Sequence, residues 1–161
     1  MKYDYWKVVC VKATNYEIVA PKGKHVRCLM EAIDMGSLSN CASPAGSVLH
    51  HIRKCMLINE WIVSLKAQII FHHMFRDGSE EFVLKVAANA RPMFKMEYYN
   101  DSTKEGMSHA NFIRSYGTYI EQWLAMKAAI KFPPGKAKED DQNIIRCYRH
   151  SNIEELLAAL P

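Results

Sequence analysis

Apolar residues recur along this chain at the spacing of amphipathic helices, and short breaker segments separate the helical stretches. Pro21 suits the first position of a helix, Gly36 ends that helix, and Ser43 before Pro44 is an N-cap signal. The pattern predicts helices from Tyr3 to Thr14, from Pro21 to Gly36, from Ser43 through Ile52, from Trp61 to Asp77, from Phe82 to Ala87, from Ser108 to Lys131, weakly from Gln142 to Tyr148, and from Ser151 onward.

The apolar stripes are clearest in the fourth and sixth predicted helices. The fourth carries Trp61, Ile62, Leu65, Ile69, His72 and His73, and the sixth carries Phe112, Ile113, Tyr116, Ile120, Trp123 and Leu124. Between the fifth and sixth helices, 91–106 is expected to be a connector that starts with a helical turn. No segment alternates apolar and polar residues over the length of a β-strand. The expected fold class is all-α, as a bundle or a right-handed superhelical stack of helices.

The last predicted helix begins with a capping box, because Glu154 follows Ser151 by three residues. Leu156, Leu157 and Leu160 give it an apolar face. An exposed face of this kind needs a partner, so we expect the chain to be part of a longer domain.

Composition and charge fit a globular protein with a basic start. Of the 161 residues, 49% are hydrophobic and 24% are charged, and the formal charge of +4 is too small to be typical of a dedicated nucleic-acid binder. Between Met1 and Arg27 the only acidic residues are Asp4 and Glu17, against the cations Lys2, Lys7, Lys12, Lys22, Lys24 and Arg27.

Cysteine usage is typical of a reducing compartment. The five cysteines are odd in number and include no CxxC pair. Asp4 and Lys7 interrupt the apolar start, so no secretory signal is expected, and no stretch is apolar enough to span a bilayer. We therefore expect an intracellular protein with reduced thiols.

Basic residues occupy the expected first turn of the second helix. A helix N-terminus carries a partial positive charge, and stability alone would favour Asp or Glu there. Lys22, Lys24 and His25 stand there instead. This placement predicts an anion site, with phosphate as the best match.

Three motifs resemble the ANTH family, the phosphoinositide-binding domain of clathrin-assembly adaptors and a relative of the ENTH domain. They are CVKATNYEIVAPKGKH (10–25), WIVSLKAQIIFHHMFRDGSEEFV (61–83) and SHANFIRSYGTYIEQW (108–123). The family signature is a lysine, nine residues, then K-x-[KR]-[HY]. The resemblance implies an α-α superhelix and a headgroup held by Lys12, Lys22, Lys24 and His25, with Lys7 and Arg27 adding background charge.

The chain also departs from the family pattern. Many relatives have a further lysine where Gly23 stands, so a weaker site is expected. Known ANTH domains run well past 161 residues, so residues 1–161 are expected to be one helical domain that forms the N-terminal part of a longer one.

Other chemistries have little support in the sequence. The pairs His50-His51 and His72-His73 are adjacent, whereas two metal ligands on one helix face stand four residues apart. No nucleophile elbow, catalytic cysteine signature or phosphate loop is present, so no enzyme, metal or cofactor is expected. Tyr98, Tyr99, Tyr116 and Tyr119 favour core packing over a stacking platform for nucleic acid.

The expected function is therefore a peripheral membrane adaptor. It would bind phosphatidylinositol 4,5-bisphosphate or a similar lipid in the anionic cytoplasmic leaflet of the plasma membrane, in clathrin-coated pits and vesicles. Clathrin and adaptors would bind through regions outside this chain. The alternative is a stacked-helix protein-interaction module without lipid binding, which would use the Leu156–Leu160 face.

Overall fold

A computed structural model describes residues 2–89 and 91–129. Within these ranges the chain forms helices and no strand, so the predicted all-α class is confirmed there. The helices are α1 (Lys2–Ala13), α2 (Gly23–Ala32), α3 (Pro44–Met56), α4 (Trp61–Asp77), α5 (Glu80–Asn89), the 3-10 helix η1 (Arg91–Phe94) and α6 (Lys104–Ala129). The helices predicted beyond 141, and with them the Leu156–Leu160 face, lie outside the described residues.

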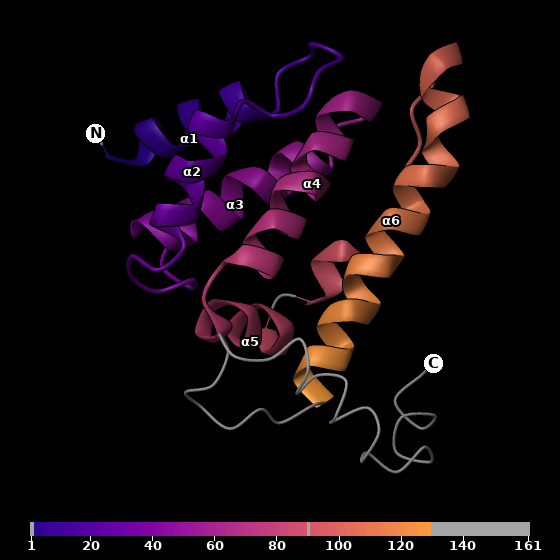
Figure 1. Cartoon of the computed structure of the whole chain (residues 1–161). Helices are drawn as coiled ribbons and strands as arrows, with labels where there is room; N and C mark the ends of the chain where they lie inside the picture. Colours follow the sequence, from indigo (N-terminus) through magenta and orange to yellow (C-terminus); the bar gives the residue numbers. More distant parts are fainter. Residues whose placement is uncertain (1, 90, 130–161) are drawn as a thin grey trace.

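The helices form a stack in which each packs against its neighbours (Figure 1). Helix α3 lies between α1 and α4, α2 packs on α1 and α3, and α4 contacts α5 and α6 on its other side. One hydrophobic core runs through all of these helices, and the largest fully buried apolar side chains in it are Leu29, Ile52, Met56, Ile70, Phe71, Met74, Phe94, Ile113 and Leu124. None of the described helices is long and apolar enough to cross a membrane.

Hydroxyl groups cap the starts of α3, α5 and α6, with Ser79 accepting a hydrogen bond from the Phe82 amide at the start of α5. The Ser43 hydroxyl accepts a hydrogen bond from the Gly46 amide at 3.2 Å, which confirms the predicted start of α3. Thr103 caps α6 in the same way, with its hydroxyl 2.9 Å from the Gly106 amide. This cap explains why α6 begins at Lys104 and not at Ser108, where the apolar stripe begins.

Asp101 is fully buried and links the starts of α4 and α6. Its carboxylate accepts hydrogen bonds from the Trp61 amide at 2.8 Å and from the Thr103 amide and hydroxyl at 2.9 and 2.8 Å. The hydrogen bond from the Thr103 backbone is the main cause that lowers the pKa of this carboxyl below its usual value. A side chain at Gly106 would collide with Asp101, so only glycine allows this approach.

The burial of α4 differs from the sequence-based stripe. The predicted residues Trp61, Ile62, Leu65 and Ile69 are only partly buried. The fully buried side chains include Val63, Ala67, Ile70, Phe71, Met74 and Phe75, together with the polar Ser64, Lys66 and Gln68. Helix α4 is covered by α3 on one side and by α5 and α6 on the other, so its buried surface is wider than one amphipathic stripe.

Candidate functional site

The four predicted site residues lie where α1 ends and α2 begins. Lys12 is in the last turn of α1, Lys22 is the N-cap residue of α2, and Lys24 and His25 are in the first turn of α2. The prediction that this helix starts at Pro21 is wrong by two residues. Lys22 has an extended backbone (φ −63°, ψ 123°), so Gly23 is the first helical residue. The three lysines are exposed and His25 is partly buried.

The lysines act electrostatically on one imidazole. Partial burial lowers the pKa of His25 below its ordinary value, and the positive charges of Lys24, Lys12 and Lys22 lower it further, in that order. The structure therefore brings all four predicted residues into one cluster, with contributions from two helices. An anion bound in this cluster would reverse the effect on His25, because it would favour the charged imidazolium.

The start of α2 lacks the features that usually stabilise a helix N-terminus. No side chain caps it, and no acidic residue lies in its first turn. The first N–H groups of a helix point along the axis with a partial positive charge. Added cations at this position cost about 0.3–1 kcal/mol each, whereas an anion there is stabilised by both the amides and the lysines.

One carboxylate lies close to the cluster. Glu17 Oε2 is 4.0 Å from Lys22 Nζ, and the two side chains are 60% and 57% exposed. An ion pair between such exposed groups contributes only about 0–1 kcal/mol. A ligand with several phosphate charges can therefore displace Glu17 from Lys22 at small cost.

Lys66 holds the loop that joins α1 to α2, and sequence reasoning did not assign it this role. Its ammonium donates to Asn15 O (2.8 Å), Asn15 Oδ1 (2.7 Å) and Glu17 O (2.6 Å), so its three donors each have an acceptor. The side chain is buried, and this burial is the main cause that lowers its pKa. The only sequence signal was a lysine within the most apolar predicted helix.

Gly23 lies in the middle of the cluster and leaves open space. A Cβ built on this residue would have no heavy atom within 4 Å apart from its immediate surroundings in the chain. Packing therefore does not require glycine at this position. A longer side chain here would extend into solvent beside Lys22 and Lys24.

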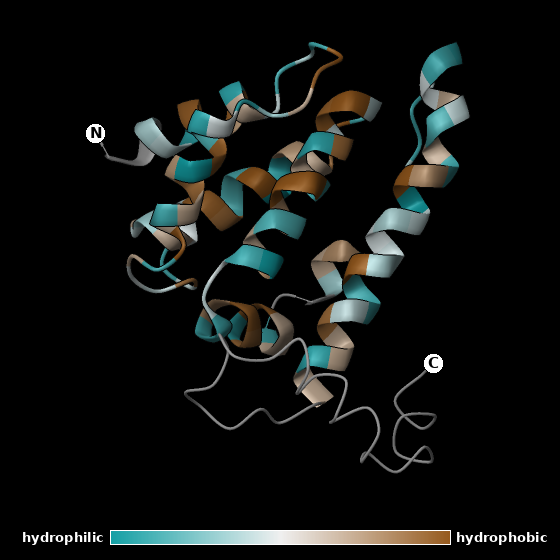
Figure 2. Cartoon of the chain, viewed as in Figure 1, coloured by the Kyte–Doolittle hydropathy of each residue, from teal (hydrophilic) through white to brown (hydrophobic). Residues whose placement is uncertain are grey.

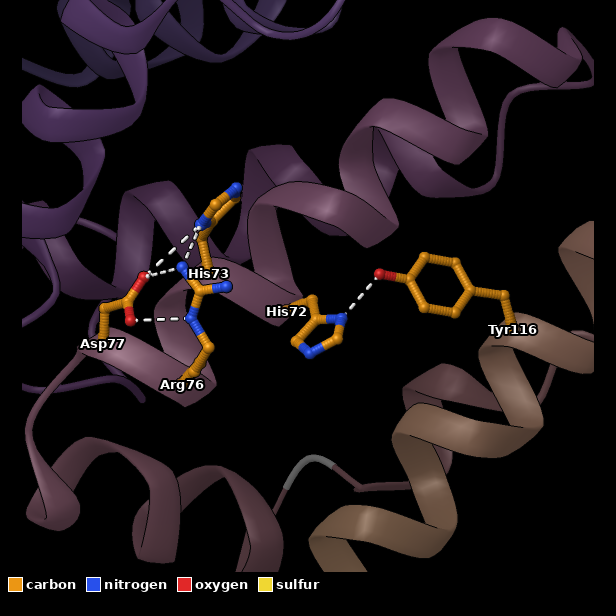
Figure 3. A network of polar contacts seen from close by, with 5 residues as sticks. All are labelled: His72, His73, Arg76, Asp77 and Tyr116. Carbon is orange, nitrogen blue, oxygen red and sulfur yellow. Dashed lines mark hydrogen bonds and ion pairs between the residues drawn. The ribbon is translucent and has the colours of Figure 1, made fainter. Parts of the chain in front are cut away.

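The paired histidines of α4 occupy hydrogen-bonded helix positions (Figure 3). His72 Nδ1 is 2.7 Å from the Tyr116 hydroxyl on α6. His73 contacts Arg76 and Asp77 instead. Its Nδ1 is 3.4 Å from Asp77 Oδ2 and 3.3 Å from Arg76 Nη2. The two imidazoles therefore have separate partners and do not share a ligand.

The rest of the described chain offers little chemistry of other kinds. No group of three or more His, Cys, Asp or Glu residues among the described residues could hold a metal ion. The thiols Cys10, Cys28, Cys41 and Cys55 are free, while Cys147 lies outside the described residues. Of the four tyrosines considered for nucleic acid, Tyr99 is buried and Tyr116 is partly buried against α4. Tyr98 and Tyr119 are 94% and 48% exposed, so the prediction of core packing is wrong for these two.

The fold and the cluster define a class of protein: an all-helical stack with a basic cluster where α1 ends and α2 begins. Residues 6–161 match the sequence profile of the ANTH domain. The chain therefore belongs to the ANTH domain family, and its stacked helices agree with the superhelix of that fold.

Several clathrin assembly proteins are similar to this chain over nearly its whole length. It is 28% identical to the phosphatidylinositol-binding clathrin assembly protein of Rattus norvegicus over 96% of this chain and 23% of the relative. It is 26% identical to the clathrin coat assembly protein AP180 of Homo sapiens over 96% of this chain and 16% of the relative. A putative clathrin assembly protein of Arabidopsis thaliana is 26% identical over 99% of this chain and 29% of the relative. The chain thus spans less than a third of the length of these relatives.

Proposed function

We propose that this chain is a phosphoinositide-binding peripheral membrane module of a clathrin adaptor, and that phosphatidylinositol 4,5-bisphosphate or a similar lipid is its ligand. The observation that carries the proposal is the gathering of Lys12, Lys22 and Lys24 around His25 at an uncapped helix start. The relatives named for phosphatidylinositol binding and clathrin assembly support it. No feature of the site is typical of an enzyme, and we assign it no cofactor.

The chemistry of the cluster suits a ligand with several phosphates. Lysine ammonium groups are compact charges on flexible stems, so each can reach a different phosphate. The backbone amides at the start of α2 supply further donors to a phosphate oxygen. An anionic leaflet adds about 1 kcal/mol for each cation near its surface. Lys7 and Arg27 are exposed and add to this general attraction.

The place of action that follows is the cytoplasmic leaflet of the plasma membrane, in clathrin-coated pits and vesicles. Contacts with the clathrin coat and with other adaptors are assigned to regions outside this chain. The single-domain assignment of residues 1–161, as the N-terminal part of a longer ANTH domain, stays a prediction. The alternative of a protein-interaction module depends on the Leu156–Leu160 face, which lies outside the described residues.

The test is co-sedimentation with phosphatidylcholine vesicles that contain or lack phosphatidylinositol 4,5-bisphosphate, at two salt concentrations. We expect binding that depends on the lipid, weakens with salt, and is lost in the Lys22→Glu/Lys24→Glu variant. The matched control is Lys85→Glu/Lys95→Glu, which reverses two exposed lysines on and after α5. Unchanged binding by the site variant, or equal losses in both variants, would contradict the proposal.

A further inference from the structure

The loop between α1 and α2 presents apolar side chains to solvent directly beside the lysine cluster. Tyr16, Ile18 and Val19 are 68%, 69% and 56% exposed. Single exposed apolar residues are common on protein surfaces, but here three stand within four positions. Figure 2 shows a brown, hydrophobic stretch in the loop that projects from the ends of α1 and α2. We call residues 16–19 the apolar loop.

The apolar loop is anchored at its base and is not a loose connector. Lys66 of α4 binds the carbonyls of Asn15 and Glu17 and the side-chain amide of Asn15. The Val19 amide donates to Glu17 O at 2.8 Å and closes a tight turn within the loop. These contacts use backbone groups, the Asn15 side chain and Lys66, and the side chains of Ile18 and Val19 remain exposed.

Charge and apolar surface thus occur together at one end of the molecule. Lys12 precedes the apolar loop, and Lys22 and Lys24 follow it. A cationic group beside exposed aliphatic and aromatic side chains is the combination that stabilises proteins at the bilayer interface, where lysines meet anionic headgroups and apolar side chains enter the acyl boundary. Tyrosine rings also favour this interface because they are amphipathic.

We propose that the apolar loop inserts into the bilayer when the lysine cluster binds its phosphoinositide headgroup. Ile18 and Val19 enter the boundary between headgroups and acyl chains, and Tyr16 lies at headgroup level. This inference rests on the proposed function. The inserted loop would add a contact with the bilayer that a soluble headgroup cannot provide. The loop therefore gives selectivity for a lipid in a membrane over the same phosphates free in solution.

The first test compares two ligands for the same variants: vesicles that contain phosphatidylinositol 4,5-bisphosphate, and soluble inositol 1,4,5-trisphosphate. We expect Ile18→Ser/Val19→Ser to bind vesicles about tenfold more weakly and the soluble headgroup as tightly as the wild type does. The control is Met35→Ser/Leu84→Ser, which removes exposed apolar side chains after α2 and on α5 and leaves both affinities unchanged.

The outcomes separate this inference from the proposed function. Unchanged vesicle binding by the loop variant, with headgroup binding intact, overturns the insertion of the loop alone. Equal losses for vesicles and headgroup also overturn it, because the loop would then only support the lysine cluster. A wild type that binds neither ligand contradicts the proposed function and the insertion with it.

A direct measurement of depth completes the test. Ile18→Trp is added to vesicles whose acyl chains carry bromine, which quenches tryptophan only at short range. We expect quenching well above that of the wild type, whose tryptophans Trp6, Trp61 and Trp123 are partly buried in the fold. Met35→Trp serves as the control and is expected to match the wild type. If Ile18→Trp is quenched no more than Met35→Trp, the loop binds a protein or remains in water, and the proposal is wrong.

Discussion

Replacing Gly23 with lysine should strengthen membrane binding without loss of folding stability. The position has open space around it, so a lysine side chain fits without displacing any neighbour. A cation in the first turn of a helix costs about 0.3–1 kcal/mol. Removal of glycine from a helix recovers about 0.5–1 kcal/mol, so these two effects nearly cancel. The free energy of unfolding should therefore stay within about 0.5 kcal/mol of the wild-type value.

The gain in binding follows from the added charge. One more cation near an anionic leaflet contributes about 1 kcal/mol, which corresponds to about fivefold tighter binding. The assay is titration of vesicles that contain phosphatidylinositol 4,5-bisphosphate, at low and at physiological salt. Gly23→Gln is the control, since it adds a side chain of similar length without charge. The reasoning is refuted if Gly23→Lys binds no more tightly than Gly23→Gln, or if its advantage does not shrink as salt increases.

Three further predictions concern single groups. Glu17→Gln removes the carboxylate 4.0 Å from Lys22 and should tighten binding to anionic vesicles by a few fold at low salt; no change in a vesicle titration would contradict this. A bound phosphate should raise the lowered pKa of His25, so the affinity for the soluble headgroup should increase as the pH falls from about 7.5 to about 6. Headgroup titrations should show a steeper increase for the wild type than for His25→Gln. Plots of affinity against pH that run parallel for the two proteins would refute this. Asp101→Asn should lower the free energy of unfolding by about 2 kcal/mol at neutral pH. The pKa of Asp101 is depressed in the folded state, so the stabilisation by its carboxylate is lost as the pH falls below about 4. The difference in unfolding free energy between the wild type and Asp101→Asn, measured by urea denaturation, should therefore shrink below that pH. A constant difference would contradict the role of the charge.

Helical periodicity predicted which segments form the described helices, although α6 begins at Lys104 and not at Ser108, and α2 ends at Ala32 and not at Gly36. Ser43 caps α3 through a residue only three positions away, and Phe82, Val83, Val86 and Ala87 of α5 are buried as their spacing indicates. The start of α2 was misplaced because Pro21 is compatible with a helix but does not require one.

Features that depend on distant segments were less visible in the sequence. The buried face of α4 is set by the helices that cover both of its sides, and its own apolar stripe does not define it. Lys66 reaches Asn15 and Glu17 across about fifty positions of sequence, and nothing near Lys66 in the chain indicates those partners. Asp101 likewise meets Trp61 only in the folded protein.

The candidate site was predictable for a different reason. Lys22, Lys24 and His25 are close in sequence, and their position at a helix start was enough to indicate an anion site. Lys12 joined them only through the resemblance to the ANTH signature, because it belongs to another helix. The structure adds what neither argument contained: the exposed apolar loop between them and the lysine that anchors it.

The most direct test of the central claim is to follow the backbone amides by NMR while inositol 1,4,5-trisphosphate is added. If a phosphate binds at the start of α2, the largest shifts should occur at the amides of Gly23 and Lys24 and at the imidazole of His25, with smaller shifts at Lys12. The same titration of Lys22→Glu/Lys24→Glu should give none of these shifts. Shifts confined to other helices, or no shifts in the wild type at headgroup concentrations that saturate known phosphate sites, would contradict the account.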